Sequence, residues 1–318
     1  MKRQFIKDLV VKTPVSDIFY IANREVKDRR DGGQFLKLEL ADKSGSIQGI
    51  MWDNVSTMID VARSGTFARV NGIVGEYNGK MQMTVSLLQP VSERDVKSED
   101  FIVVSKYPIE EMYAELLGFF DEVTDPHLRR LLDTVFGDAD IVRQFNAAPG
   151  GAKVHHAYIG GLLEHTLFML RASRSLKATY AEANYPLLAA GIILHDIGKI
   201  DEYKYQLAID HTDEGRLLGH VVMGYQRIDA VIRKLPGFPP ELAKMLLHII
   251  LSHHGEMEFG APKTPKFVEA YLVHMLDHID AWVAMFRTAT KNQSDAKWTD
   301  YHSYLETNVF LPGKEPKS

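Results

Sequence analysis

The sequence of 318 residues contains no cysteine. Disulfide bonds and cysteine-based zinc sites are therefore excluded, and any metal must be held by nitrogen and oxygen ligands. Long apolar runs are also absent, because no stretch approaches the roughly 20 apolar residues that a membrane-spanning helix needs. The N-terminal MKRQFIKDLV lacks an apolar core of signal-peptide length. These absences predict a soluble, cytoplasmic protein without a membrane partner.

Charge is divided unevenly along the chain. The net charge is −5, with 45% hydrophobic and 25% charged residues, an ordinary composition for a globular chain of one to three domains. Residues 1–94 hold 14 Lys and Arg against 11 Asp and Glu, whereas the remainder holds 23 against 31. The first part is thus mildly basic. The second part is acidic, which suits a site that gathers cations.

Residues 14–90 have the alternating pattern of half-buried β-strands. In QFLKLELAD, one side of the strand carries Leu36, Leu38 and Leu40. The other side carries Phe35, Lys37 and Glu39. Asn78-Gly79 predicts a hairpin between the last two strands, since both residues tolerate positive φ. VSTMIDVARSG predicts a short helix between the third and fourth strands. This order is typical of an OB-fold barrel, with an SH3-like or other small barrel as the alternative.

The pattern changes to helices after a polar linker. PVSERDVKSED is rich in charge, and helical periodicity then recurs from YPIEEMYAELLGFFDEV to about residue 306. We therefore predict a multidomain chain with an all-β barrel followed by an all-α domain. The expected bounds are 1–92 for the barrel, 93–105 for the linker, 106–310 for the helical domain and 311–318 for a disordered tail.

All 13 histidines lie beyond residue 120, and several stand at the ends of apolar helical segments. A single histidine on an apolar face is usually a satisfied core residue, but so many in one helical domain indicate a metal site. GIILHDIGK ends an apolar run with His195, Asp196 and Lys199. Without thiols, imidazole and carboxylate ligands suit Mn²⁺, Fe²⁺, Co²⁺, Ni²⁺ or Zn²⁺.

The series GGLLEHTL, LHDIGK, LLGH, LSHHG and VHMLDHID, spread over residues 150–290, resembles the HD-domain metal-dependent phosphohydrolases. The resemblance implies an all-α HD domain whose signature is a histidine, a His-Asp pair and a distant aspartate. By position these residues are His165, His195, Asp196 and Asp277. Asp280 lies about 60° from Asp277 on a helix, so the spacing leaves both open and the family pattern favours Asp277.

Some HD enzymes hold two metal ions. The resemblance implies that this chain also has a site for two ions. It implies that Asp196 bridges them, with His165, His195 and Asp277 on one ion and His220, His253 and His254 on the other. His254 is the least certain member, since either residue of an adjacent pair can point away. Mn²⁺ is the first choice of ion, and Mg²⁺ joins the alternatives above. We assign His248, His274 and His278 to structural roles or to positions that support the ligands from behind.

Metal ions lower the pKa of a bound water and offset charge on phosphoryl oxygens. Besides Asp196, we expect Lys199 to take part by donating to a phosphate oxygen, with a solvated lysine at a helix end as the alternative. His155 and His156 are candidates for binding phosphate or protonating a leaving group, or for a structural role.

The barrel narrows the choice of substrate. OB-folds commonly bind single-stranded nucleic acid through basic grooves and aromatic platforms. If the alternate leucines face the barrel core, Phe35 and Lys37 face outward, and Trp52 faces outward from the next strand. These three side chains are the predicted substrate-binding residues of the barrel. Packing of the aromatic rings against the helical domain is the alternative.

The combination of OB-fold and HD domain resembles the YhaM-type 3′–5′ exoribonucleases over nearly the full chain. It is carried by VHHAYIGGLLEHTL, EGRLLGH and LSHHGEMEFGAP. The implied function is stepwise hydrolysis of single-stranded RNA, with single-stranded DNA as a second substrate, to nucleoside 5′-monophosphates. A homo-oligomer is allowed but not indicated by the sequence.

The sequence leaves two alternative functions. One is a cyclic-dinucleotide or nucleotide phosphodiesterase of the HD-GYP type. That family places Glu after its paired histidines and a Gly-Tyr-Pro later, whereas here Gly255 follows the pair and no Gly-Tyr-Pro occurs. The other is a non-enzymatic OB-fold protein that binds nucleic acid and carries a degenerate HD domain. It is disfavoured because every expected ligand position is filled.

Overall fold

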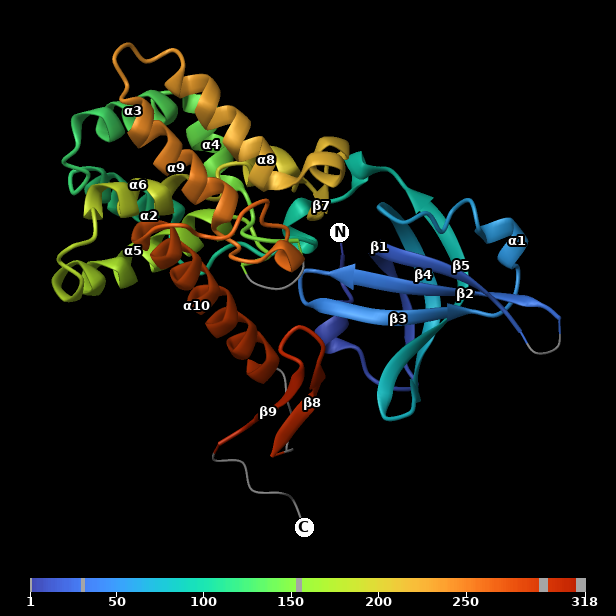
Figure 1. The fold of residues 1–318 in the computed structure, drawn as a ribbon. Helices are drawn as coiled ribbons and strands as arrows, with labels where there is room; N and C mark the ends of the chain where they lie inside the picture. Colours follow the sequence, from blue (N-terminus) through green and yellow to red (C-terminus); the bar gives the residue numbers. More distant parts are fainter. Residues whose placement is uncertain (1, 30–31, 153–155, 292–296, 313–318) are drawn as a thin grey trace. The chain divides into compact units, whose positions relative to one another are not determined.

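The computed structural model describes residues 2–29, 32–152, 156–291 and 297–312 (Figure 1). The chain divides into two compact units, which are 1–103 with 205–210 and 104–204 with 211–318. Among the described residues, no helix combines the length and the apolar character that crossing a bilayer requires.

The first unit is a closed five-stranded barrel with the strand order β1-β2-β3-β5-β4. All its pairs are antiparallel except β3 with β5, which pair in parallel and close the barrel. The short helix α1 (Val55–Met58) lies between the third and fourth strands. This architecture confirms the predicted OB-fold. The strands are β1 (Pro14–Asp28), β2 (Gln34–Asp42), β3 (Gly45–Met51), β4 (Thr66–Tyr77) and β5 (Lys80–Val91).

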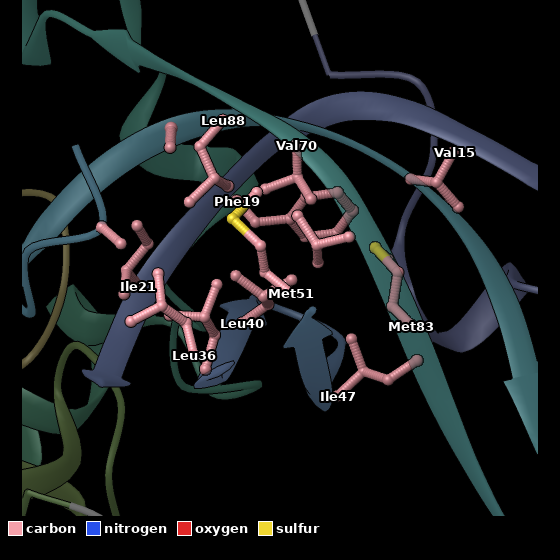
Figure 2. Packing of buried hydrophobic residues seen from close by; sticks show 14 of the residues in the cluster. Val15, Phe19, Ile21, Leu36, Leu40, Ile47, Met51, Val70, Met83 and Leu88 are labelled. Carbon is pink, nitrogen blue, oxygen red and sulfur yellow. The ribbon is translucent and has the colours of Figure 1, made fainter. Parts of the chain in front are cut away.

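The alternation in β2 places its leucines in the barrel core, as predicted. Leu36, Leu38 and Leu40 are buried and belong to one hydrophobic cluster with residues of the other strands, among them Phe19, Met51, Met83 and Leu88 (Figure 2). The β4–β5 hairpin turns at Asn78 and Gly79, with φ values of 50° and 72°. The positive φ angles are those of a tight hairpin turn, so the local sequence decides where this pair of strands meets.

The segment predicted as a linker holds two single-turn 3₁₀ helices, Glu93–Asp95 and Ser98–Asp100. The backbone N–H of Lys43 donates to the carbonyl of Asp100 over 3.1 Å. The ring of Phe101 lies 4.9 Å from that of Phe67. The chain thus packs on the barrel up to about residue 103.

The second unit is mainly helical. Its central helix α6 lies against α3, α5, α9 and α10, and every residue of α6 except Pro186 is buried. Such a helix is apolar on all sides, as a helix at the centre of a bundle must be. The helices are α2 (Ile109–Phe120), α3 (Pro126–Phe136), α4 (Ala139–Ala147), α5 (Gly161–Thr179), α6 (Tyr185–Leu194), α7 (Lys199–Glu202), α8 (Asp213–Ile232), α9 (Pro240–Ser252) and α10 (Val268–Lys291), with a 3₁₀ turn at Met257–Phe259.

Helix α8 is broken inside its length. Gly219 has φ 73° and ψ 155°, a conformation outside the helical region that glycine adopts without steric cost. The second half of α8 therefore begins directly at His220. This break decides where the imidazole of His220 points.

The prediction of helices to about residue 306 is wrong at its end. After α10 the chain forms a hairpin of β8 (Trp298–His302) and β9 (Thr307–Phe310), and two short strands, β6 (Tyr203–Lys204) and β7 (Asp210–His211), follow α7. Glu306, at φ 51°, lies in the turn before β9. Leu305 and Val309 of the hairpin pack on Met285 of α10. Aromatic residues in this stretch favour strands, which outweighs the apparent helical spacing.

Only the first two residues of the predicted tail 311–318 lie within the described part of the chain. Leu311 is buried, and its backbone N–H donates to the carbonyl of Lys297 over 2.9 Å. The ordered chain therefore extends past β9 by at least this residue.

Candidate metal centre

Five helices bring the histidines and aspartates of the motifs together. His165 lies in α5, His220 in the second half of α8 and Asp277 in α10. His195 caps α6 at its C-terminus, and His253 caps α9 in the same way. The apolar bodies of these helices form the core of the unit, and their polar ends therefore meet at a fixed place. Each of the seven predicted metal ligands lies there.

One cluster joins His165, His195 and Asp277, whose ligand atoms all lie within 4.8 Å of one another. His165 Nε2 lies 3.3 Å from His195 Nε2 and 3.3 Å from Asp277 Oδ1. Both histidines are fully buried. The spacing is that of donor atoms arranged around a common point.

A second cluster joins Asp196, His220, His253 and His254, again within 4.8 Å. His220 Nε2 lies 3.3 Å from His254 Nε2. The two clusters meet at Asp196. Its Oδ2 lies 3.3 Å from His195 Nε2, while its Oδ1 lies 3.4 Å from His220 Nε2 and 3.5 Å from His253 Nε2. The carboxylate thus presents one oxygen to each cluster.

Hydrogen bonds at Nδ1 orient four of the imidazoles. His195 donates from Nδ1 to the carbonyl of Ile192 over 2.7 Å, and His253 donates to the carbonyl of Ile250 over 2.7 Å. A carbonyl can only accept, so the proton of each ring lies on Nδ1 and the Nε2 lone pair faces the cluster. Such a partner on the opposite nitrogen is typical of metal-ligating histidines.

Two carboxylates orient the remaining pair. Asp280 Oδ2 lies 2.7 Å from His165 Nδ1, and Glu202 Oε2 lies 2.9 Å from His220 Nδ1. Asp277 lies in the first cluster, whereas Asp280 lies on the Nδ1 side of His165, where it forms a third possible metal-binding group with His156 and His165. Sequence reasoning did not single out Glu202. The glycine before His220 was a signal, since a break there leaves a helix N–H that needs an acceptor.

Buried polar atoms without partners mark the centre. Among the described residues, Oδ1 of Asp196 and Nε2 of His253 are buried and lack a hydrogen bond, whereas Oδ2 of Asp196 lies 2.5 Å from the ammonium of Lys199. Leaving such groups unsatisfied costs about 1–3 kcal/mol each, and more for a charge. Lone pairs of imidazole and carboxylate that converge at 3.3–3.5 Å repel one another unless a cation lies among them. The donor set therefore fits divalent cations.

The protonation of these groups also fits cation binding. Burial lowers the pKa of His253, and burial with the neighbouring histidines lowers the pKa of His254 to about 3. Both imidazoles are therefore neutral and able to coordinate at pH 7. Burial opposes the charged form of His165, but hydrogen bonds to Asp277 and Asp280 outweigh it and raise its pKa to about 10. Without a bound ion His165 is therefore protonated at pH 7, unlike the other two histidines, and coordination would require the proton on its Nε2 to leave.

Lys199 is buried beside the shared carboxylate. Its side chain is about 6% exposed, and Nζ lies 2.5 Å from Asp196 Oδ2. Nζ also donates to the carbonyl of Gly150 over 2.5 Å. The alternative of a solvated lysine at a helix end is therefore wrong, because the ammonium is enclosed and paired. The predicted phosphate contact stays a prediction.

His156 is buried behind the first cluster, and His155 lies outside the described residues. His156 Nε2 lies 2.7 Å from Asp280 Oδ2, and Nδ1 lies 2.8 Å from the hydroxyl of Tyr158. Its φ of 50° is uncommon for a residue with a side chain. Both ring nitrogens have partners within the protein, so a contact with substrate would require one of them to be released.

His274 holds the turn that carries the paired histidines. Its Nδ1 lies 2.9 Å from the carbonyl of His253. Gly255 has φ +79°, and a Cβ at this position would collide with the ring of His274. Only glycine fits this turn, and His274 thus has the structural role that the sequence predicted.

The aromatic residues predicted on the barrel surface lie side by side. The ring centroids of Phe35 and Trp52 are 4.8 Å apart, and the Arg29 guanidinium lies 5.2 Å from the Trp52 ring. Trp52 is 43% exposed. Lys37 lines an open groove of about 300 Å³ together with Asn23, Glu25, Leu38, Glu39, Ser46 and Gln48. The surface combines aromatic faces, cations, amide groups and the carboxylates of Glu25 and Glu39.

Comparison with known proteins agrees with this architecture. The family model of the HD domain matches residues 162–282, and that of the OB-fold nucleic acid binding domain matches residues 22–91. The second match covers most of the barrel. The first spans all seven clustered residues.

Curated relatives are similar over nearly the whole chain. The 3′-5′ exoribonuclease YhaM of Bacillus velezensis is 30% identical over 297 residues, which cover 93% of this chain and 94% of that protein. The YhaM of Bacillus subtilis is 32% identical over 281 residues, with 88% of each chain covered. The YhaM of Shouchella clausii is 32% identical over 281 residues, covering 87% and 86%.

Proposed function

Because the chain belongs to the YhaM family of 3′–5′ exoribonucleases, we propose that its two clusters hold two divalent cations on either side of Asp196. The chain is a metal-dependent 3′–5′ exoribonuclease with a nucleic-acid-binding OB-fold. The proposal concerns which residues carry this activity. The observation that supports it best is the buried Asp196 carboxylate, which presents one oxygen to each cluster and whose Oδ1 has no hydrogen-bond partner in the protein.

In this proposal His165, His195 and Asp277 would hold one ion together with Asp196. His220, His253 and His254 would hold the other, again with Asp196. Mn²⁺ is the proposed ion, because nitrogen and carboxylate ligands without thiols suit it, and Fe²⁺, Co²⁺, Ni²⁺, Mg²⁺ and Zn²⁺ are the alternatives. Bound ions of this kind lower the pKa of water and offset charge on a phosphodiester.

The remaining residues position this ligand set. Asp280 and Glu202 fix the rings of His165 and His220 by accepting from Nδ1. Lys199 holds Oδ2 of Asp196 in place. We propose that, when a phosphodiester enters, the ammonium shifts part of its hydrogen bonding from the carbonyl of Gly150 to a phosphate oxygen. His155 and His156 remain proposed contacts to the substrate.

We propose that the barrel holds a single strand on the surface of Phe35, Lys37 and Trp52. Stacking on aromatic rings tolerates any base, which suits an enzyme that degrades a strand stepwise. A lysine nearby offers a contact for the phosphate backbone. The substrate would be single-stranded RNA, with single-stranded DNA as a second candidate, and the products nucleoside 5′-monophosphates.

One local observation argues against the cyclic-dinucleotide alternative. That family has a glutamate after its paired histidines. Here the position is Gly255, where a Cβ would collide with His274. A glutamate therefore cannot occupy this turn without displacing the ring that supports His253.

The test is an incubation of the purified protein with Mn²⁺ and single-stranded RNA labelled at either end. RNA labelled at the 5′ end should shorten one nucleotide at a time, and RNA labelled at the 3′ end should release labelled 5′-mononucleotide at once. A chelator should stop both reactions, and added Mn²⁺ should restore them. A cyclic dinucleotide incubated in parallel should stay intact. Its hydrolysis with RNA untouched would contradict the proposal.

A further inference from the structure

Helix α10 presents a stripe of apolar side chains to solvent. We call these six residues the α10 stripe, and their exposed fractions are 48% for Val268, 56% for Tyr271, 51% for Ile279, 37% for Trp282, 41% for Val283 and 38% for Phe286. On a helix of 100° per residue, all six positions lie within one face. The six positions extend from the first residue of α10 to Phe286, over most of the helix Val268–Lys291.

The opposite face of α10 is buried in the helical unit. It carries Asp277 of the first cluster and Asp280 behind it, with Ala270 and Val273 fully buried. A helix that is apolar on its outer face as well as its inner face is typical of a buried helix. The outer face of α10 therefore has the character of an interface.

Exposed charge is missing from this face. Between Val268 and Phe286 the charged residues are Glu269, Asp277 and Asp280. Glu269 is buried and accepts from the backbone of Asn184, while Asp277 faces the metal centre and Asp280 lies behind His165. Depletion of charge with enrichment of Trp, Tyr and Phe is the composition of the core of a protein–protein interface. Single-stranded nucleic acid, by contrast, is bound by stacking aromatic rings together with Lys and Arg, and the stripe has the aromatic rings but neither cation.

The area suits a dimer. The six side chains expose on the order of 500 Å² of mostly apolar surface, which is at the upper end of the patches that monomers show. Two such stripes facing each other would bury about 1,000 Å², near the lower bound for a specific interface. Because the face carries no exposed charge, two copies of it can pack together without like-charge repulsion. Two-fold dimers are also the commonest oligomers.

We propose that the α10 stripe is a two-fold dimer interface, in which α10 of one copy packs against α10 of a second copy. The stripe is then covered by its own symmetry mate, and the helix that supplies Asp277 lies between the metal centre and the partner subunit. Ile279, in the middle of the stripe, lies close to the two-fold axis.

The absence of cysteine allows a direct test. Ile279→Cys introduces the only thiol of the chain, and a residue near a two-fold axis meets its own copy. Mild oxidation at low protein concentration should give a covalent product of twice 36.0 kDa. Leu117→Cys, on α2 and 42% exposed, is the matched control and should stay monomeric under denaturing conditions. Equal cross-linking of both variants, or none of either, would overturn the proposal.

Sedimentation velocity gives an independent measurement. The wild-type protein should sediment as a dimer at micromolar concentration. Ile279→Arg with Phe286→Arg should give a folded monomer by circular dichroism, while Leu117→Arg keeps the dimer. A monomeric wild type, or a dimer that survives both charges, would contradict the interface. If the variant with Ile279→Arg and Phe286→Arg keeps the mass of the wild type but binds RNA more weakly, the stripe is a binding surface for nucleic acid and the dimer proposal is wrong.

Discussion

Glu202 binds His220 twice. Its Oε2 lies 2.9 Å from Nδ1 of the imidazole, and its Oε1 accepts from the backbone N–H of the same residue over 3.1 Å. The second bond caps the half of α8 that starts after the break at Gly219. One carboxylate therefore fixes both the ring and the backbone of a proposed metal ligand.

We expect Glu202→Gln to weaken metal binding by about 10–100-fold, the usual effect of removing a group that orients a ligand. The amide keeps the size of the side chain but loses the charge that strengthens both hydrogen bonds. Calorimetric titration with Mn²⁺ measures the change. Glu214→Gln, an exposed residue of α8, is the control and should bind as the wild type. An unchanged affinity in the Glu202 variant would refute its positioning role.

Asp196→Asn should abolish hydrolysis while RNA binding is largely kept. The amide cannot offer a negatively charged oxygen to each cluster, whereas the barrel surface is untouched. The measurements are turnover of labelled RNA, metal content of the purified protein, and RNA affinity by fluorescence anisotropy. Asp140→Asn, a surface residue with 78% of its side chain exposed, serves as the control. Wild-type turnover and metal content in the Asp196 variant would disprove the assignment of both clusters.

The turn at Gly255 predicts a stability difference between two glycine variants. Gly237 has φ +71° with open space around a Cβ, whereas Gly255 has φ +79° and a Cβ there would meet the ring of His274. We expect Gly237→Ala to lower the free energy of unfolding by about 1 kcal/mol, and Gly255→Ala by about 3 kcal/mol because overpacking adds to the strain. Urea denaturation compares them. Equal losses of unfolding free energy in the two variants would show that the ring of His274 moves aside without cost, and would contradict the prediction.

The paired rings on the barrel predict a substrate-length effect. Trp52→Ala with Phe35→Ala should weaken binding of long single strands by about 10–100-fold, since stacking contributes about 1–3 kcal/mol per base. Hydrolysis of a dinucleotide, which does not reach across a stacking surface, should change little. Tyr77→Ala, an aromatic that is 66% exposed in β4, is the matched control. If long and short substrates are affected alike, the stacking role is wrong.

Local features of the sequence predicted much of this molecule. The alternation in β2 and the Asn78-Gly79 turn depend on neighbouring residues alone, so they could be interpreted without the fold. Two of the ligand motifs follow the same logic, because His195 and His253 each stand at the end of an apolar helix whose burial the sequence shows. Family resemblance then related His165 to Asp277, which no local pattern connects.

Other features depend on packing between distant segments. Glu202 reaches His220 because α7 and α8 pack closely, and a Cβ at Gly198 or Gly215 would collide with the opposite backbone. The buried ammonium of Lys199 donates to the carbonyl of Gly150, which lies 49 residues away in the sequence. The β8–β9 hairpin is held by Met285 of α10. Charge and spacing within one segment carry no information about such partners.

The shared carboxylate of Asp196 has a thermodynamic consequence. Because its two oxygens face different clusters, cations bound there would not bind independently. The first would orient the carboxylate and offset part of its charge, which changes the affinity of the second. Linkage requires the same coupling free energy in either order of binding. Substituting a ligand of one cluster would therefore alter the affinity of the other, and the metal content of such variants would report both sites together.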